Sequence, residues 1–268
     1  MNASPRRRSS GAGLLFLFVI VIASGRQCNK PAPSTTHTVS TPVPVRNPIR
    51  DALRPDPAVE YRDGIAAVIL MDTSGSMRES VRDSDGNMRR KIEIAQRAAL
   101  GLVTQFDRYA GEHPDQNIFL GVYEFSDRGR GTPSCRPVIP LGKPDPASAQ
   151  SAISQMRPDG ETPIGDAMIV AKRDLDKSGL SKRHILVVTD GENNTGYSPA
   201  NVTQVVSTQP DKDRASIYFV AFDVAAAKFN PVRDAGGVVL AASNESELTS
   251  NLDYLLAGKI LVEQPLTK

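Results

Sequence analysis

The sequence is poor in side chains that bind soft metals and in excess charge of either sign. Its 268 residues include only two cysteines and three histidines, and no histidine has a neighbouring ligand pattern. The first 28 residues hold four arginines and no acid, which leaves 28 basic against 30 acidic residues in the remainder. The composition therefore gives no support for a thiolate or imidazole metal centre or for nucleic-acid binding.

The chain also lacks an apolar run long enough for a typical membrane span. Three arginines precede an apolar run from Leu14 to Ala23, which small residues follow, and this is the order of a secretory signal. We therefore predict that residues 1–28 are a signal peptide or membrane anchor and that the body is exported, to the periplasm or another extracytoplasmic site. The apolar run is well short of the roughly 20 residues that a spanning helix needs, so cleavage after Gly25 is favoured over a retained anchor. A lipid anchor on Cys28 is a third alternative, although the two residues before it are not the small ones of a lipobox.

Residues 29–62 are predicted to form a linker. They hold seven prolines together with serine, threonine, valine and arginine, a mixture that should not form a helix and has too little clustered apolar surface for a core. We expect an extended tether, although composition alone does not separate a spacer from simple disorder. One folded domain is expected over residues 63–262, followed by a short tail of residues 263–268.

Beyond residue 63, short apolar segments alternate with stretches of helical periodicity. Apolar residues recur at helical spacing over 92–106, 164–175 and 248–255, and Asn244 and Glu247 are placed as a capping pair before the last. This alternation predicts an α/β domain, Rossmann-like and doubly wound, with a mostly parallel central sheet and helices on both faces. The segments typical of strands buried on both faces are 65–71, 118–125, 185–188, 217–222 and 238–242.

Polar residues follow two of these predicted strands directly. Asp72 comes after "IAAVILM" and Asp190 ends "HILVVTD". Ligands of such sheets bind outside the carboxyl ends of the strands, so the two carboxylates are expected to face one crevice. Thr162 stands just before Pro163, a residue that favours the first position of a helix, and is expected on a loop at a helix start.

These residues resemble a known motif. Asp72, Ser74 and Ser76 match the D-x-S-x-S of von Willebrand factor A (VWA) domains, while Thr162 and Asp190 match the separate threonine and second aspartate of that family. The resemblance covers about 200 residues. It implies a metal-ion-dependent adhesion site, in which the hydroxyls touch Mg²⁺ or Mn²⁺ and the aspartates often act through water. Hydroxyl and carboxylate oxygens are suitable ligands for such hard cations.

The resemblance implies a binding module and not an enzyme. A metal held by neutral hydroxyls stays electron-poor and can accept an Asp or Glu side chain of a protein partner, in adhesion or in assembly of an envelope complex. The alternative is a metal-dependent, phosphatase-like hydrolase using Asp72, because haloacid dehalogenase-type phosphatases also begin with an aspartate at the end of the first strand. That class needs a second acid two residues later, where this chain has Ser74. In the simplest interpretation, "DTSGS" is only a turn that caps the next helix.

A cysteine and a polar stretch allow two further predictions. Cys135 is either a free buried thiol or, in an oxidising compartment, the partner of Cys28 in a possible disulfide that fastens the tether to the domain. The stretch "DSDGNMRRK" begins like a calcium loop, but basic residues follow and no closing glutamate is present. We expect a polar hairpin there.

Overall fold

The structure is a computed structural model of the chain, and it describes residues 46–129 and 131–262. The predicted signal or anchor, Cys28 and the short C-terminal tail lie outside the described residues. The described residues belong to one compact unit. Of the helices in the described ranges, none combines the length and the apolar content needed to cross a bilayer.

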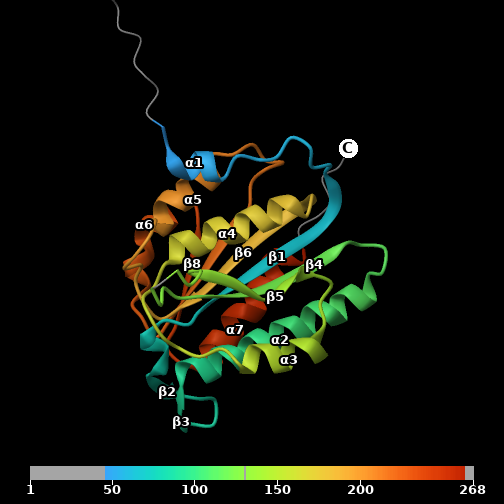
Figure 1. The fold of residues 1–268 in the computed structure, drawn as a ribbon. Coiled ribbons are helices and arrows are strands. Elements are labelled where there is room, and N and C mark those ends of the chain that lie inside the picture. Colours follow the sequence, from blue (N-terminus) through green and yellow to red (C-terminus); the bar gives the residue numbers. More distant parts are fainter. Residues whose placement is uncertain (1–45, 130, 263–268) are drawn as a thin grey trace, which may run out of the picture. The chain divides into compact units, whose positions relative to one another are not determined.

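A six-stranded sheet forms the centre of this unit, in the order β5-β4-β1-β6-β7-β8. All neighbouring strands are parallel except β4 and β5, which are antiparallel. A separate hairpin of β2 and β3 projects beside the start of α2 (Figure 1). The strands are β1 (Arg62–Asp72), β2 (Ser80–Arg82), β3 (Met88–Arg90), β4 (Ile118–Phe125), β5 (Cys135–Gly142), β6 (Leu180–Thr189), β7 (Ser216–Phe222) and β8 (Val238–Ala242).

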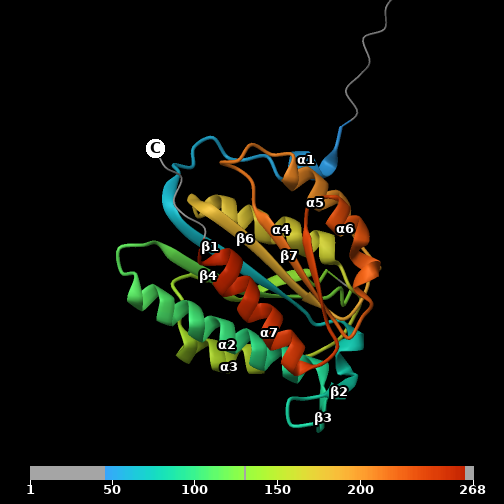
Figure 2. The same ribbon diagram turned by 180° about the vertical axis from the view of Figure 1, so that it is seen from behind.

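Helices cover both faces of the sheet, as Figures 1 and 2 show from opposite sides. The predicted α/β, Rossmann-like class is therefore confirmed. On one face lie α2 (Lys91–Glu112), α3 (Pro146–Ser154) and α7 (Glu245–Leu255), and on the other lie α1 (Pro48–Ala52), α4 (Ile164–Lys177), α5 (Pro199–Ser207) and α6 (Asn230–Asp234). Short helical turns occur at Gly75–Arg78, Ala226–Phe229 and Leu256–Ile260.

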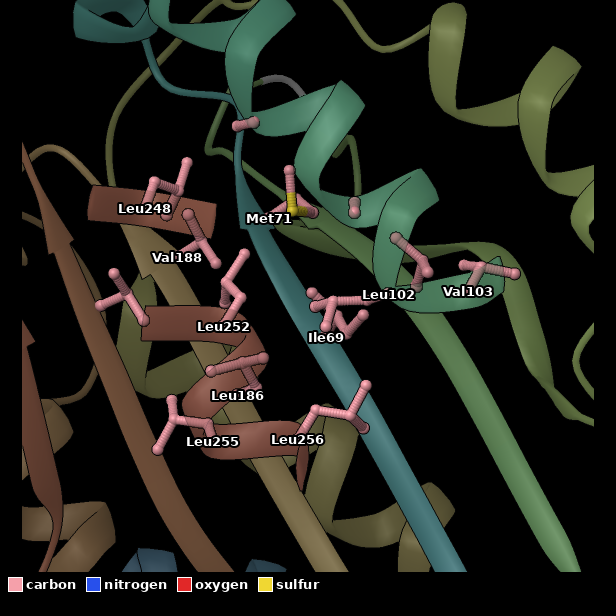
Figure 3. Close-up of a cluster of buried hydrophobic side chains, with 14 of the residues drawn as sticks. Ile69, Met71, Leu102, Val103, Leu186, Val188, Leu248, Leu252, Leu255 and Leu256 are labelled. Atoms are coloured by element: carbon pink, nitrogen blue, oxygen red, sulfur yellow. The ribbon is translucent and has the colours of Figure 1, made fainter. Parts of the chain in front are cut away.

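Strand β1 is buried on both faces because its side chains alternate between two apolar cores. Ile69 and Met71 contribute to the core beneath α2 and α7, whereas Val68 and Leu70 contribute to the core beneath α4 and α5. Figure 3 shows the first core, where Leu102 of α2 and Leu252 of α7 approach the sheet. This two-sided burial is the reason that the sequence of β1 is a continuous apolar run and not an alternating one.

The segment before β1 differs from its prediction. Residues 48–52 were expected within an extended linker, but they form the short helix α1, and Ile49 and Leu53 are buried in the core beneath α4 and α5. The Asn47 side chain caps this helix by accepting hydrogen bonds from the N–H groups of Ile49 (3.0 Å) and Arg50 (3.2 Å). Pro48 occupies the first turn, where a missing N–H is tolerated, so it begins a helix here instead of preventing one.

The strand order changes direction at the carboxyl end of β1. From β1 the chain passes through α2 to β4 on one side, whereas β6 lies on the other side. The connections that leave β1 and β6 therefore diverge at this edge. In α/β sheets this is the place where ligands bind.

Candidate metal site at the carboxyl edge of the sheet

Asp72 is the last residue of β1, and its side chain is fixed from two directions. The Asp72 carboxylate is fully buried. Its Oδ1 atom accepts a hydrogen bond from the Ser74 N–H at 2.7 Å, which closes a tight turn. Its Oδ2 atom accepts one from the Thr189 hydroxyl at 2.6 Å, from the end of the neighbouring strand β6. The turn and the adjacent strand thus hold one carboxylate in a defined orientation.

Hydroxyl groups connect this turn to the second carboxylate. The Oγ atoms of Ser74 and Ser76 lie 3.2 Å apart. Ser76 Oγ donates a hydrogen bond to Asp190 Oδ1 at 2.7 Å, across the gap between the ends of β1 and β6. Four of the five residues predicted from the sequence motif are therefore brought together through direct contacts.

Thr162 reaches the same edge on a loop that is attached to three strand ends. The Asp159 N–H donates to the Thr73 carbonyl at 2.7 Å, and the loop pairs with Asp127 just after β4 through a two-residue bridge at Glu161. The Thr162 N–H donates to Asn194 Oδ1 at 2.7 Å, which ties it to the loop after β6. Helix α4 then begins at Ile164, close to where the proline predicted it.

The hydroxyls of Thr162 and Ser76 converge beside Gly191. A β-carbon on Gly191 would lie 3.6 Å from Thr162 Oγ1 and 3.7 Å from Ser76 Oγ. Both oxygens are therefore within 3.7 Å of one point next to the backbone that follows Asp190. The absence of a side chain at Gly191 keeps that space available.

Lys91 is a residue of this edge that the sequence interpretation missed. It is the first residue of α2, only 3% exposed, and its Nζ atom lies 3.0 Å from Asp190 Oδ2. The same ammonium lies 2.8 Å from Glu79 Oε2 and 2.9 Å from Asp223 Oδ2. In the sequence, a lysine that opens an amphipathic helix is typical of a solvated end, so no local signal pointed to a buried ion pair.

The surroundings shift the pKa values of Asp72 and Lys91 for different reasons. Burial raises the pKa of Asp72 to about 6, against hydrogen bonds from Ser74 and Thr189 that lower it, and the charge of Asp190 adds to the rise. Burial by itself lowers the pKa of Lys91, but its bonds to Glu79, Asp223 and Asp190 outweigh this and hold the pKa above the ordinary value. The metal-free edge therefore disfavours a charge on Asp72 and favours one on Lys91.

Three more polar residues, in the loop after β6 and within β6, are held by contacts with other parts of the fold. Asn193 Oδ1 accepts a hydrogen bond from the Gly165 N–H at 3.2 Å, and Glu192 forms an exposed ion pair with Lys228 at 2.7 Å. His184 is packed in the sheet, stacked on Tyr218 with ring centroids 6.0 Å apart. None of these contacts adds a ligand to the edge.

The polar hairpin and the Cys135 thiol, both singled out in the sequence, are described by the structure. The stretch from Ser80 to Arg90 is the polar β2–β3 hairpin that was expected. Cys135 is a buried thiol at the start of β5, and burial, together with nearby carboxylates, raises its pKa to about 12. Since Cys28 lies outside the described residues, their pairing stays a prediction.

The groups that could hold a cation here are oxygen atoms. They are the hydroxyls of Ser74, Ser76 and Thr162 and the carboxylates of Asp72 and Asp190. Within the described ranges, no three His, Cys, Asp or Glu side chains gather as a cation site, so a metal at this edge would depend on the hydroxyls. This donor set fits a hard divalent cation such as Mg²⁺ or Mn²⁺, which prefers oxygen ligands and retains several waters.

The comparisons with known proteins identify the domain. Residues 67–192 match the family model of the von Willebrand factor type A domain. This range begins inside β1 and ends just after Asp190, so it contains all five candidate residues. The chain therefore contains a VWA domain, as the motif predicted.

Solved structures share this fold. A von Willebrand factor type A protein from Catenulispora acidiphila has a TM-score of 0.54 and 20% identity over 73% of this chain, which spans 42% of that protein. An aerotolerance-related membrane protein from Bacteroides fragilis has a TM-score of 0.53 and 18% identity over 73% of this chain and 100% of its own. The pilus adhesin SpaC from Lactobacillus rhamnosus GG has a TM-score of 0.54 and 15% identity over 75% of this chain and 30% of its own. A comparison with curated proteins gave no significant match.

Proposed function

We propose that this chain is an exported, tethered VWA module that holds Mg²⁺ or Mn²⁺ and uses it to capture an acidic side chain of a partner protein. The observation that carries the proposal is the continuous chain of contacts from the Asp72 carboxylate through Ser74 and the half-buried Ser76 hydroxyl to the Asp190 carboxylate. A turn that only capped a helix would not need a carboxylate on each of two neighbouring strands.

The residues divide into two roles. Ser74, Ser76 and Thr162 would touch the ion, and Asp72 and Asp190 would support it through water. Both aspartates already accept hydrogen bonds from neighbouring groups. This suits carboxylates that contact the ion through a water molecule and not directly. A bound ion would supply a site for a carboxylate from outside, since neutral hydroxyl ligands leave most of its charge uncompensated.

The loops around this edge would select the shape of the partner. Met88 on the β2–β3 hairpin and Tyr197 after β6 are large apolar side chains exposed to solvent. Both belong to segments that flank the ends of β1 and β6. An exposed aromatic or methionine side chain near a charged contact is typical of surfaces that recognise proteins.

We favour a binding module over a hydrolase. A phosphatase of the haloacid dehalogenase type would need an acid two residues after Asp72, and here Ser74 is engaged with Ser76 instead. No release of phosphate from an aryl phosphate is therefore expected in the presence of Mg²⁺. The signal-like N-terminus motivates the proposed location outside the cytoplasmic membrane, and a reporter fused after Lys268 that functions only in the cytoplasm would argue against it.

The decisive experiment compares Thr162→Ala with the wild type in Mg²⁺ and in EDTA. The wild type should bind Mg²⁺ in isothermal titration and unfold at a higher temperature with it, since a hundredfold excess over Kd stabilises the fold by about 2.7 kcal/mol. Thr162→Ala should lose most of this response, because it removes a candidate ligand oxygen from a buried residue that belongs to neither of the two apolar cores. Binding of the wild type to a purified envelope fraction should fall in EDTA and recover with Mg²⁺.

Thr104→Ala is the matched control. Thr104 lies on the exposed side of α2, where its hydroxyl donates to the Leu100 carbonyl. Its Mg²⁺ response should equal that of the wild type. Identical behaviour of wild type and Thr162→Ala would show that the site is not formed as proposed.

A further inference from the structure

We propose that Lys91 is a built-in counterion of the candidate metal site, which neutralises Asp190 in the metal-free protein and thereby keeps the metal affinity low. This inference rests on the proposed function, because it concerns the same site. The metal would therefore be exchangeable. The domain stays folded without the ion and binds it only when the concentration of the ion in the surroundings is sufficient.

The placement of the ammonium supports this role. Among the three carboxylates around Lys91 Nζ, only Asp190 belongs to the candidate site, and its side chain is completely buried. The other two face solvent, with 68% of the Glu79 side chain and 40% of the Asp223 side chain exposed. The ammonium therefore has one inner contact with the site and two outer contacts that hold it there.

The backbone fixes the same arrangement. The Lys91 N–H donates to the Glu79 carbonyl at 2.8 Å, so the first residue of α2 is attached to the loop that follows Ser76. Asp223 lies just after β7 with a positive φ of 53°. Aspartate is one of the few residues besides glycine that adopt this conformation readily, and here it accompanies a side chain that reaches the ammonium.

The surroundings of Lys91 stabilise its charged form. Its Nζ atom lies within 3.0 Å of three carboxylate oxygens, from Glu79, Asp190 and Asp223. The candidate site therefore has a positive charge directly beside Asp190.

Two opposite effects follow from Coulomb's law. In the metal-free protein, Asp72 and Asp190 bring two carboxylates to one edge of the sheet, and the ammonium compensates the charge of Asp190. A divalent cation held beside Ser76 would share Asp190 with an ammonium that lies only 3.0 Å from that carboxylate. The like charges repel, so the ammonium stabilises the empty site and opposes the filled one.

The test is the neutral substitution Lys91→Met, which keeps the unbranched side chain up to the position of Cε and removes the charged Nζ. Isothermal titration with MgCl₂ should give a Kd at least about tenfold lower than that of the wild type, the size expected for one nearby charge in a partly buried site. The melting temperature in EDTA should fall, and the rise on adding Mg²⁺ should exceed that of the wild type. A lysine with a merely structural role would give the opposite result, weaker binding of the metal.

Lys172→Met is the matched control. Lys172 is also completely buried and bonded to a carboxylate, with both oxygens of Asp176 at 2.6 Å, but it lies on α4 beside Arg183, near the start of β6 and away from the carboxyl edge. Its loss should lower the melting temperature while the Kd for Mg²⁺ stays within about twofold of the wild type, because the charge removed is distant from the ion.

Each other outcome is decisive. If the wild type binds Mg²⁺ and Lys91→Met binds it equally or more weakly, Lys91 does not oppose the metal and only this inference is overturned. If the wild type does not bind Mg²⁺ at all, the proposed function fails first and the role of Lys91 with it. If Lys91→Met is unfolded in EDTA, Mg²⁺ should restore its circular dichroism, and a variant that stays unfolded in both conditions contradicts the inference.

Discussion

Asp72 carries a charge that the metal-free fold disfavours. The carboxylate is completely buried, and its pKa is raised from 3.8 to about 6. Between these two values the folded state binds more protons than the unfolded state, so Asp72 makes the fold more stable as the pH falls. This contribution is complete below about pH 4 and is lost as the pH rises through about 6, a difference of about 3 kcal/mol.

Asp72→Asn should remove this pH dependence. An asparagine Oδ1 can still accept from the Ser74 N–H, and the Thr189 hydroxyl, 3.0 Å from the Gly191 carbonyl, has an alternative acceptor. Urea unfolding in EDTA should therefore show that the variant gains stability relative to the wild type between pH 4.5 and 7.5. If the stability difference between the two proteins is the same at both pH values, Asp72 does not titrate in this range. In Mg²⁺ at pH 7.5 the order should reverse, because only the wild type gains from the metal.

At the scale of elements, the loop after β6 and the start of α4 hold each other in place. A β-carbon on Gly165 would lie 1.9 Å from the Tyr197 carbonyl oxygen. Gly196 has a φ of +69°, and a β-carbon there would lie 2.4 Å from Asp166 Oδ2. The Tyr197 N–H in turn donates to Asp166 Oδ1 at 2.9 Å. This close packing fixes the loop that also positions Thr162 through Asn194.

Gly165→Ala should push this loop away from α4. We expect a loss of about 1–3 kcal/mol in unfolding free energy together with weaker binding of Mg²⁺, both measurable by urea unfolding and isothermal titration. Gly101→Ala is the control, because Gly101 lies on the exposed side of α2 with no atom within 4 Å of its would-be β-carbon. That substitution should stabilise the protein by about 0.5–1 kcal/mol and leave the metal affinity unchanged. Equal metal affinity in both variants would show that the loop does not position the site.

Elements with a regular pattern were predictable, and those determined by their surroundings were not. The central strands and the long helices follow from continuous apolar runs and helical periods, and the capping of α7 follows from Asn244, whose side chain accepts from the Glu247 N–H at 2.9 Å. Strand β5 gave no such signal, because Pro137 and Pro140 interrupt it. An edge strand tolerates missing donors that a central strand would not.

The candidate site was predictable to a similar degree. Asp72 and Asp190 each follow an apolar run that ends at the carboxyl edge, so their meeting could be inferred from topology alone. Lys91 could not be found in this way, since its burial depends on Glu79 and Asp223, which come from two other parts of the chain. An ion pair between distant segments leaves no periodic trace in the sequence.

At the scale of the whole molecule, the folded unit includes residues that precede the central sheet in the sequence. Helix α1 contacts α5 and buries two apolar side chains, and Gln209 Nε2 donates to the Leu53 carbonyl at 3.0 Å. Tyr61 adds a second attachment, through its hydroxyl bond of 2.5 Å to Asp213. Residues that compositionally belong to a linker are therefore part of the core.

Leu53→Ala in the full chain should lower the unfolding free energy by about 2–5 kcal/mol, because a fully buried leucine leaves a cavity when it is shortened. Chemical denaturation measures the loss. Arg50→Ala on the exposed side of the same helix should change the stability by less than about 0.5 kcal/mol. If both substitutions are equally harmless, α1 is not part of the cooperative unit.

Strand β5 makes one kind of contact between copies of this molecule unfavourable. It ends the order of the sheet, and two of the eight residues in Cys135–Gly142 are prolines that have no N–H to donate. A strand from another molecule needs a row of such donors in order to extend a sheet. Addition of a strand from another molecule along this edge, the step by which a sheet grows into a ribbon, is therefore disfavoured.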